Sequence, residues 1–283
     1  MHTLAFVNQK GGCGKTTAAV NLAGALAGGA ARVLLVDLDP QAHATLALGC
    51  AIEDEPTVTD VLAGDRPIDE VVQRVAGEIT LLPATERLAE FEETAARMIG
   101  PERRLRAALE RVAPLYDFAI LDCSPRADGV LAANALRAAD TAVLIVECGT
   151  FALQGALKTL GVLAEVGERD AHTFETLVLA TLMDRRTRFA RELLIAIQAR
   201  FGERMFDTAI QTSVRLREAA AAGVPVQVLD PECRSAQEFV FLADEVRELA
   251  VRSRPPALTA TDPFSPAESP IPSRSFEPAQ STR

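Results

Sequence analysis

The sequence predicts an α/β fold, a doubly wound, mostly parallel sheet with helices on both faces. Short apolar runs alternate with longer stretches of helical periodicity along most of the chain, which is the order expected of repeated βαβ units. Glycines or carboxylates follow several of these apolar runs. Because ligands of open parallel sheets bind beyond the carboxyl ends of the strands, we expect one functional edge of the sheet.

Composition limits the number of domains and the class of protein. The chain has 283 residues, 48% of them hydrophobic, and a formal net charge of −10. No apolar stretch reaches the about 18 residues that suggest a bilayer span, and because strand pattern begins at the N-terminus, no signal peptide is expected. We expect a folded domain over residues 1–252. Residues 253–283 hold seven of the sixteen prolines and are expected to be a Pro/Ser-rich disordered tail.

The cysteines indicate a reducing compartment. There are five, an odd number, and no C-x-x-C pair occurs among them, so a closed set of disulfides is not expected. We expect a cytoplasmic protein whose cysteines fill its core. Since the whole chain is acidic, any contact with nucleic acid has to use a local basic surface.

The first functional motif lies between an apolar strand at residues 4–7 and a helical pattern at residues 18–26. It consists of Lys10, Gly11, Gly12, Cys13, Gly14, Lys15, Thr16 and Thr17. Strand, glycine-rich turn and helix are the context of a phosphate-binding loop, in which backbone N–H groups approach phosphate oxygens. We expect Lys15 to reach the β- and γ-phosphates and the Thr16 hydroxyl to bind Mg²⁺.

This loop departs from the general pattern G-x-x-x-x-G-K-[ST]. Gln9 stands where the pattern has its first glycine, and a second lysine, Lys10, precedes Lys15. The chain contains only three lysines, the third being Lys158. Because arginine supplies the other basic residues, two lysines in one loop indicate a need for compact ammonium groups beside phosphate.

Two further apolar runs end in carboxylates. The first spans residues 32–37 and leads into a loop with Asp37 and Asp39, and the second spans residues 116–122 and ends at Asp122. A carboxylate at a strand tip beside a phosphate loop binds Mg²⁺ directly or through water, as in the Walker B motif. These acids are therefore expected at the same edge as the loop.

The remaining elements complete the alternation of strands and helices. We expect helices at residues 57–62, 85–99, 101–112, 130–138 and 235–252, and strands at residues 78–83, 140–146 and 174–182. The valine-rich residues 223–231 are predicted to form the last strand and turn.

A basic segment follows the strand at residues 174–182. Residues 185–217 contain eight arginines and three acids, which gives +5 in an acidic chain. Apolar residues recur there at the spacing of a helical stripe, namely Phe189, Leu193 and Ile197. We expect this stripe to be buried while Arg188 and Arg191 point outward. Clustered guanidinium groups suit contacts to DNA phosphates without base readout, and a solvated face with local salt bridges is the alternative.

Together these motifs resemble those of the ParA/MinD family of deviant Walker A ATPases, closest to the ParA and Soj type. Residues 10–17 match K-G-G-x-G-K-T-T, and residues 37–45 resemble D-x-D-P-Q-x-x-x-T. Residues 122–125 resemble the second switch of the family, with Ser124 in place of a proline. The resemblance covers about residues 1–250 and implies a P-loop ATPase domain that uses ATP and Mg²⁺.

The resemblance also implies roles for single residues. Lys10 is the signature lysine, which crosses a dimer interface to touch the partner's nucleotide. Asp39 orients or activates the attacking water, while Asp37 supports the shell of the Mg²⁺ that Thr16 and Asp122 bind. Residues 212–219 resemble a further family motif, and the arginines implicated in DNA contact are Arg185, Arg186, Arg188, Arg215 and Arg217.

Two details stay open from the sequence. His43 stands where the family often has asparagine, and it either tunes hydrolysis or is a solvated loop residue. The adenine is expected near residues 181–184 and near residues 223–231, without assignment to single side chains.

The function expected from the resemblance is that of a partitioning ATPase. It would form an ATP-dependent homodimer, bind DNA non-specifically, and hydrolyse ATP slowly until a ParB-like partner protein stimulates it. The cycle would move a chromosome, plasmid or other cargo on the nucleoid, without membrane contact. The main alternative is a MinD-like membrane-associated ATPase, although no C-terminal amphipathic basic helix is evident. An iron–sulfur reductase component using Cys123 and Cys148, and a metabolite kinase, are further alternatives.

Overall fold

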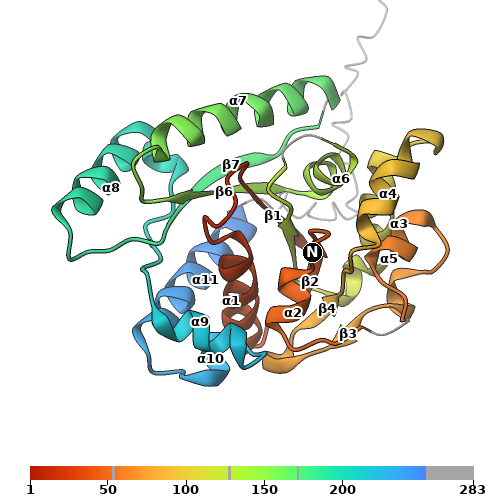
Figure 1. Cartoon of the computed structure of the whole chain (residues 1–283), viewed down its shortest axis with the longest axis horizontal. Coiled ribbons are helices and arrows are strands. Elements are labelled where there is room, and N and C mark those ends of the chain that lie inside the picture. Colours follow the sequence, from red (N-terminus) through yellow and green to blue (C-terminus); the bar gives the residue numbers. More distant parts are fainter. Residues whose placement is uncertain (53–54, 127–128, 171, 253–283) are drawn as a thin grey trace, which may run out of the picture.

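The protein is described by a computed structural model that covers residues 1–52, 55–126, 129–170 and 172–252. These residues form one seven-stranded sheet in the order β3-β4-β2-β5-β1-β6-β7, as Figure 1 shows. The strands are β1 His2–Val7, β2 Val33–Leu38, β3 Gln73–Arg74, β4 Thr80–Leu82, β5 Phe118–Cys123, β6 Thr141–Glu147 and β7 Glu175–Thr181. The predicted doubly wound, mostly parallel sheet is confirmed, since only β3, at the edge, is antiparallel to its neighbour.

Helices cover both faces of this sheet. The helices are α1 Lys15–Gly28, α2 His43–Ala47, α3 Val58–Ala63, α4 Leu88–Thr94, α5 Arg104–Val112, α6 Val130–Ala138, α7 Ala152–Asp170, α8 Arg188–Phe201, α9 Val214–Ala221, α10 Val226–Leu229 and α11 Arg234–Arg252. Short 3₁₀ segments lie at Ile68–Glu70, Ala76–Glu78, Ala95–Arg97, Pro101–Arg103, Ala113–Leu115 and Gly202–Arg204.

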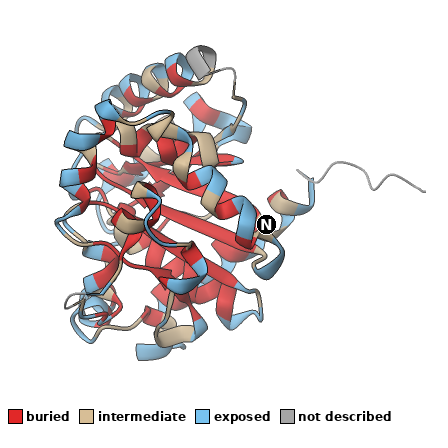
Figure 2. Cartoon of the chain, turned by 90° about the vertical axis from the view of Figure 1, so that its right-hand side faces the viewer, coloured by how far each residue is buried: buried red, intermediate tan, exposed pale blue. Residues whose placement is uncertain are grey.

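The core has two layers because strand side chains alternate between the faces. In β1, Leu4 and Phe6 pack in the layer with α1, α9, α10 and α11, whereas Ala5 and Val7 pack in the layer with α3, α4, α5 and α6. Helices α7 and α8 continue this second layer over β6 and β7. Figure 2 shows the central strands as buried throughout. Strand β1 is therefore held between two helical layers, which fixes the position at which the chain leaves the sheet at the carboxyl end of β1.

The prediction of a last strand at residues 223–231 was wrong. Within this stretch, Val226–Leu229 form the helix α10, preceded by Pro225. The Asn21 side chain of α1 accepts a hydrogen bond from the Val226 N–H at 2.7 Å, and the Gln227 amide donates to the Asn21 carbonyl at 3.0 Å. Packing on α1 thus overrides the strand preference of the valines.

Two helical predictions need smaller corrections. The buried stripe of α8 does not include Phe189, which is exposed, and instead includes Ala190 together with Ile197. The Thr187 hydroxyl caps this helix through the Ala190 N–H at 3.2 Å, which sets the helix start and hence the buried side. The predicted helix over residues 85–99 is shorter, since α4 begins at Leu88. The predicted tail over residues 253–283 lies outside the described residues.

Candidate nucleotide site

The phosphate loop leaves the carboxyl end of β1 and enters α1. Gly12 and Gly14 have φ angles of +72° and +91°, a region where residues with a Cβ are strained, so glycine is required at both turns. Gly14 directly precedes α1. The first N–H groups of that helix are therefore presented at the loop, where they are suited to bind an anion.

Contacts from neighbouring strands hold this loop. The Asn8 amide donates to the Ile145 carbonyl at 2.5 Å, and the Asn8 side-chain oxygen accepts from the Lys10 N–H at 3.0 Å. On the other side, the Thr181 hydroxyl donates to the Cys13 carbonyl at 2.7 Å. Strands β6 and β7 thus fix the loop, as a phosphate cradle requires.

The two lysines of the loop have different surroundings. Lys15 is buried, and its ammonium donates to the Lys10 carbonyl at 3.3 Å, inside the loop. The Lys10 side chain is 60% exposed and forms an ion pair with Glu147 at the end of β6. Sequence reasoning predicted separate roles for these lysines, and the structure gives them separate environments.

Asp37 lies at the end of β2 and is fully buried. Its carboxylate accepts hydrogen bonds from the Thr45 N–H at 2.9 Å, from the Thr45 hydroxyl at 2.8 Å and from the Asp39 N–H at 3.1 Å. Burial raises the pKa of Asp37 to about 6, against the lowering effect of these hydrogen bonds. The carboxylate is thus engaged in ordering residues 37–45, and its support of the metal shell stays a prediction.

Asp122 lies beside Asp37 in the paired strands β5 and β2. Both of its carboxylate oxygens are buried without a partner in good hydrogen-bond geometry, although Thr16 lies near enough to favour the charged form. Burial, and then the charge of Asp37, raise the pKa of Asp122 well above its usual range. A buried carboxylate without donors calls for a cation. Thr16 and Asp122 therefore fit a Mg²⁺ ion.

Asp39 follows β2 and is 7% exposed. One carboxylate oxygen accepts the Gln41 N–H at 3.0 Å, which orients the side chain. Ala42 then adopts φ +53° in the left-handed region, before the short helix α2 begins at His43. The role of Asp39 in positioning water stays a prediction.

A cleft of about 400 Å³ adjoins the phosphate loop. It lies between α1, α2 and α9, and its lining residues are Thr16, Thr17, Val20, Asn21, His43, Leu46, Ala47, Leu216, Ala220, Ala221 and Val224. The cleft thus extends from the loop toward residues 223–231, one of the two regions expected near the adenine. His43, which the sequence left open, lines it.

The cysteines considered for the iron–sulfur alternative are Cys123 and Cys148. Cys123 and Cys148 are buried, and burial raises the pKa of both thiols, that of Cys148 to about 11. Among the described residues, no group of three or more His, Cys, Asp or Glu side chains is placed to hold a metal.

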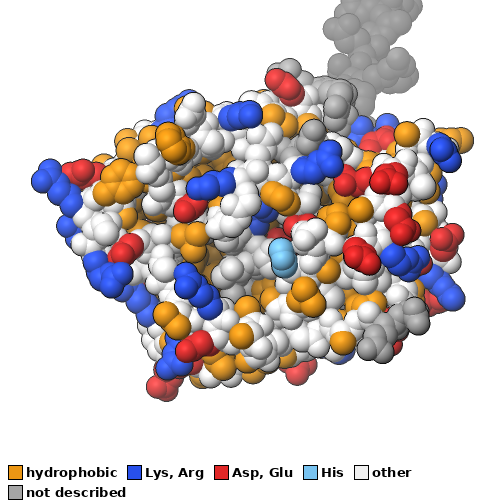
Figure 3. Space-filling view, in the orientation of Figure 1, with side chains coloured by type: hydrophobic (Ala, Val, Ile, Leu, Met, Phe, Trp, Pro, Cys, Tyr) orange, Lys and Arg blue, Asp and Glu red, His pale blue; other side chains and the backbone are white. Residues whose placement is uncertain are grey.

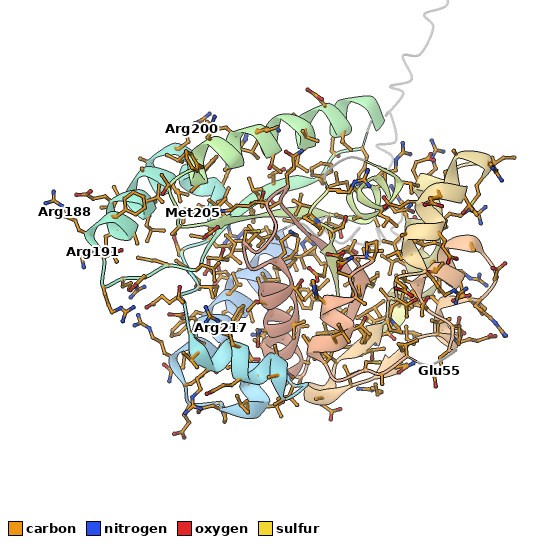
Figure 4. All side chains as sticks on the ribbon, viewed as in Figure 1. Glu55, Arg188, Arg191, Arg200, Met205 and Arg217 are labelled. Carbon is orange, nitrogen blue, oxygen red and sulfur yellow. The ribbon has the colours of Figure 1, made fainter. Side chains whose placement is uncertain are left out.

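The arginine surface lies on the segment that leads into α8 and on α9. We use this name for Arg185, Arg186, Arg188, Arg215 and Arg217, all of which are exposed. Figure 4 shows Arg188 and Arg191 projecting from α8, with Arg217 on α9. In Figure 3, basic side chains gather on the left of this face, over α8 and α9, while acidic ones gather on the right.

Local carboxylates pair with part of the arginine surface. Arg186 contacts Asp184 through two hydrogen bonds of 2.9 Å, and Arg188 contacts Glu192 at 2.6 Å. Separately, Arg215 pairs with Glu218 at 2.8 Å and with Asp230 at 3.2 Å. Within the described part of the chain, Arg185 and Arg217 have no acidic partner within 4 Å. The structure therefore contains both the free cations that DNA needs and the local pairs of the alternative interpretation.

Sequence reasoning missed several residues that build this site. Asn8 and Thr181 hold the loop, Thr45 holds Asp37, and Glu147 holds Lys10. Glu147 was visible as an acid at a strand end. Its partner was not, because the pairing depends on β6 lying next to β1.

Comparisons with known proteins test the expected family. The model of an AAA domain family matches residues 1–176. The sporulation initiation inhibitor protein Soj of Bacillus subtilis is 38% identical over 247 residues, covering 86% of this chain and 97% of that protein. The chromosome partitioning protein ParA of Caulobacter vibrioides is 35% identical over 251 residues, covering 87% of this chain and 94% of that protein.

Solved structures share the fold. Cobyrinic acid a,c-diamide synthase from Mycobacterium smegmatis, with bound ADP and magnesium, has a TM-score of 0.78 and 30% identity, covering 90% of this chain and 97% of that chain. The septum site-determining protein MinD from Pyrococcus horikoshii, complexed with Mg-ADP, has a TM-score of 0.69 and 26% identity, covering 88% and 97%. None of the helices in the described ranges combines the length and apolarity needed to span a membrane.

Proposed function

Because this chain belongs to the family of the Soj and ParA partitioning ATPases, we propose that it works as an ATP-dependent dimer that binds DNA without base readout. The protein is a P-loop ATPase that uses ATP and Mg²⁺. The observation that carries the dimer proposal is the contrast between the two loop lysines. Lys15 is buried within its own loop, whereas Lys10 carries its ammonium at the surface.

Within one subunit, the loop holds the phosphates. The groups that would contact ATP are the backbone N–H groups of Gly11, Gly12, Cys13, Gly14, Lys15, Thr16 and Thr17, together with the side chains of Lys15 and Thr16. Thr16 and Asp122 would hold Mg²⁺, which would neutralise phosphate charge when bound, and Asp37 orders the adjoining loop. The Asp39 carboxylate orients the attacking water. Phosphoryl transfer at such a site depends on positioning and charge, so a small displacement of these residues slows it strongly.

Between subunits, Lys10 completes the site of the partner. An exposed ammonium on a fixed backbone can reach a phosphate outside its own subunit, whereas the buried Lys15 cannot. Nucleotide would then bring two subunits together with each Lys10 at the other's ATP. Hydrolysis removes the phosphate charge that attracts it, and the pair loosens.

DNA binding by the dimer uses the arginine surface. Guanidinium groups bind phosphate oxygens at fixed geometry without reading bases, and two subunits double the number of contacts. The partners proposed are non-specific DNA and a ParB-like protein that stimulates hydrolysis. Both place the protein at the nucleoid, where it would partition a chromosome, plasmid or comparable cargo.

Two relatives suggest other activities. The MinD structure has the same fold and was solved with Mg-ADP, and the synthase structure carries the name of a biosynthetic enzyme. Soj and ParA are more similar in sequence, at 38% and 35% identity against 30% for the synthase and 26% for MinD. This ranking supports partitioning over membrane association or biosynthesis.

Binding to random-sequence DNA with ATP or ADP tests the proposal. We expect binding with ATP that weakens steeply as salt rises, and little binding with ADP. The matched control is Lys15→Ala, which should bind DNA equally poorly with either nucleotide. Equal DNA affinity with ATP and ADP in the wild-type protein would contradict the proposed cycle.

A further inference from the structure

Lys10 combines a fixed backbone with a side chain that one contact restrains. Its N–H donates to Asn8 at 3.0 Å, and its carbonyl accepts from the Cys13 thiol at 3.2 Å and from the Lys15 ammonium at 3.3 Å. Its own ammonium contacts a single acidic residue within the described ranges, the carboxylate of Glu147. Only this last contact has to break for the ammonium to move.

We propose that Glu147 is a positioning residue that retains Lys10 in its own subunit until a partner's nucleotide competes for it. The inference rests on the proposed function, in which Lys10 acts on the ATP of the other subunit. Glu147 then determines the concentrations of ATP and of protein at which the dimer forms.

The position of Glu147 supports this role. It is the last residue of β6, and β6 pairs with β1, which carries the phosphate loop. Its side chain is 29% exposed, so the ion pair lies at the surface of the nucleotide site and not in the core. A carboxylate beside a site for anionic phosphates opposes binding unless a cation neutralises it. Lys10 provides that cation in the free subunit.

Among the residues that the structure describes, the Glu147 carboxylate has no hydrogen bond or ion pair other than the contact with Lys10. The backbone of Glu147 pairs with Thr181 of β7, and its carbonyl accepts the Gly149 N–H at 2.8 Å. These contacts use main-chain atoms and persist when the side chain is changed. Glu147→Gln keeps the shape and removes the charge, so it separates retention of Lys10 from folding.

The size of the effect follows from the number of pairs broken. A partly exposed ion pair changes an equilibrium constant by a factor of about 1.5 to 5. Each dimer releases two copies of Lys10, so the factor enters twice. We expect Glu147→Gln to lower the dissociation constant of the dimer by about 2- to 25-fold with a non-hydrolysable ATP analogue.

Sedimentation over a range of protein concentrations measures this constant. Glu147→Gln should form dimers at lower concentration than the wild type, whereas Glu147→Asp, which keeps the charge, should lie near the wild type. In a Lys10→Ala background, Glu147→Gln should have no effect. An unchanged or weaker dimer in Glu147→Gln, or the same gain without Lys10, would overturn the proposal.

Amine labelling of the nucleotide-free protein tests the contact without the dimer. An ion pair shields an ammonium from acylation, and the exposed Lys158 serves as an internal reference. Labelling of Lys10 relative to Lys158 should rise several-fold in Glu147→Gln and should stay low in Glu147→Asp. No rise would overturn retention by Glu147. If the rise occurs but Lys10→Ala dimerises normally, the trans role of Lys10 fails while the retaining contact stands.

Discussion

The phosphate-loop edge and the arginine surface are two charged regions built on opposite principles. At the edge, partners come from distant strands, as when Asn8 contacts Ile145 and Thr181 contacts the carbonyl of Cys13. On the arginine surface, most partners lie within four residues along the chain, as in the pair of Arg188 with Glu192, and only the contact of Arg215 with Asp230 among the pairs described is longer in range. The first region is fixed by the sheet, whereas the second needs only exposure.

This difference fits the ligand that we propose for each region. A phosphoryl group in transfer needs donors at fixed positions, so the loop is tied on both sides. DNA phosphates form a repeating array, and non-specific binding depends on charge density more than on exact placement. Exposed pairs such as Arg186–Asp184 are weak and can exchange a carboxylate for a phosphate. Changes at the edge should therefore act abruptly, and changes on the surface in increments.

The largest effect is expected from Lys15→Ala. In the proposed site the buried ammonium makes charge-assisted hydrogen bonds to phosphate, so its loss should weaken ATP binding on the order of 100-fold or more. Isothermal titration of ATP measures this loss. Lys158→Ala, at an exposed position of α7, is the matched control and should bind as the wild type does. Unchanged affinity in Lys15→Ala would refute the loop assignment.

Asp39→Ala should uncouple binding from hydrolysis. Loss of a group that orients the attacking water lowers turnover by about 10²- to 10⁴-fold, while ATP affinity stays within a few-fold. Phosphate release under single-turnover conditions gives the rate. The control is Asp65→Ala, which should leave the rate unchanged. Asp65 is exposed and lies far from the phosphate loop in the sequence. Normal turnover in Asp39→Ala would remove that residue from the mechanism.

The arginine surface should respond in steps. Arg185 and Arg217 have no acidic partner within 4 Å in the described residues, so their joint replacement by alanine should flatten the salt dependence by about two phosphate contacts. Replacing Arg186 and Arg188, which are paired locally, should cost less. Fluorescence anisotropy with random DNA at several salt concentrations gives both slopes. If the affinity for DNA is unchanged in both double variants, the arginine surface is a solvated surface that does not bind DNA.

The smallest effect is expected at an exposed pair outside both regions. Arg32 holds the pKa of Asp117 at about 2, below its usual range, through hydrogen bonds of 2.8 and 2.9 Å. A lowered pKa stabilises the fold above the usual carboxyl range and loses that contribution as pH falls toward 2. Asp117→Asn should lower the melting temperature at pH 7 by at most about 4 °C, with a smaller difference near pH 3. A larger difference at the lower pH would contradict this sign.

The sequence predicted regions whose chemistry demands fixed spacing. The loop at residues 10–17 and the acids at the ends of β2 and β5 lie at one edge of a parallel sheet, as expected. The prediction from sequence failed where tertiary contacts determine the secondary structure. Nothing local in residues 226–229 shows that Asn21 of α1 would stabilise a helix there.

Pairings between strands escaped prediction for the same reason. Glu147 and Lys10 are far apart in the chain and meet only because β6 lies beside β1. The arginine surface could be found from composition, but which of its members are already paired could not. That depends on rotamers and on the course of the backbone around Asp184 and Asp230.

The measurement that tests the account most directly is the mass of the nucleotide-loaded protein with and without Lys10. Wild type and Lys10→Ala are saturated with a non-hydrolysable ATP analogue, and mass and bound nucleotide are determined on the same samples. We predict that both bind one nucleotide per chain and that only the wild type doubles from 30.2 kDa. A wild type that stays at this mass when loaded, or a Lys10→Ala protein that doubles equally well, would contradict a pair joined through Lys10.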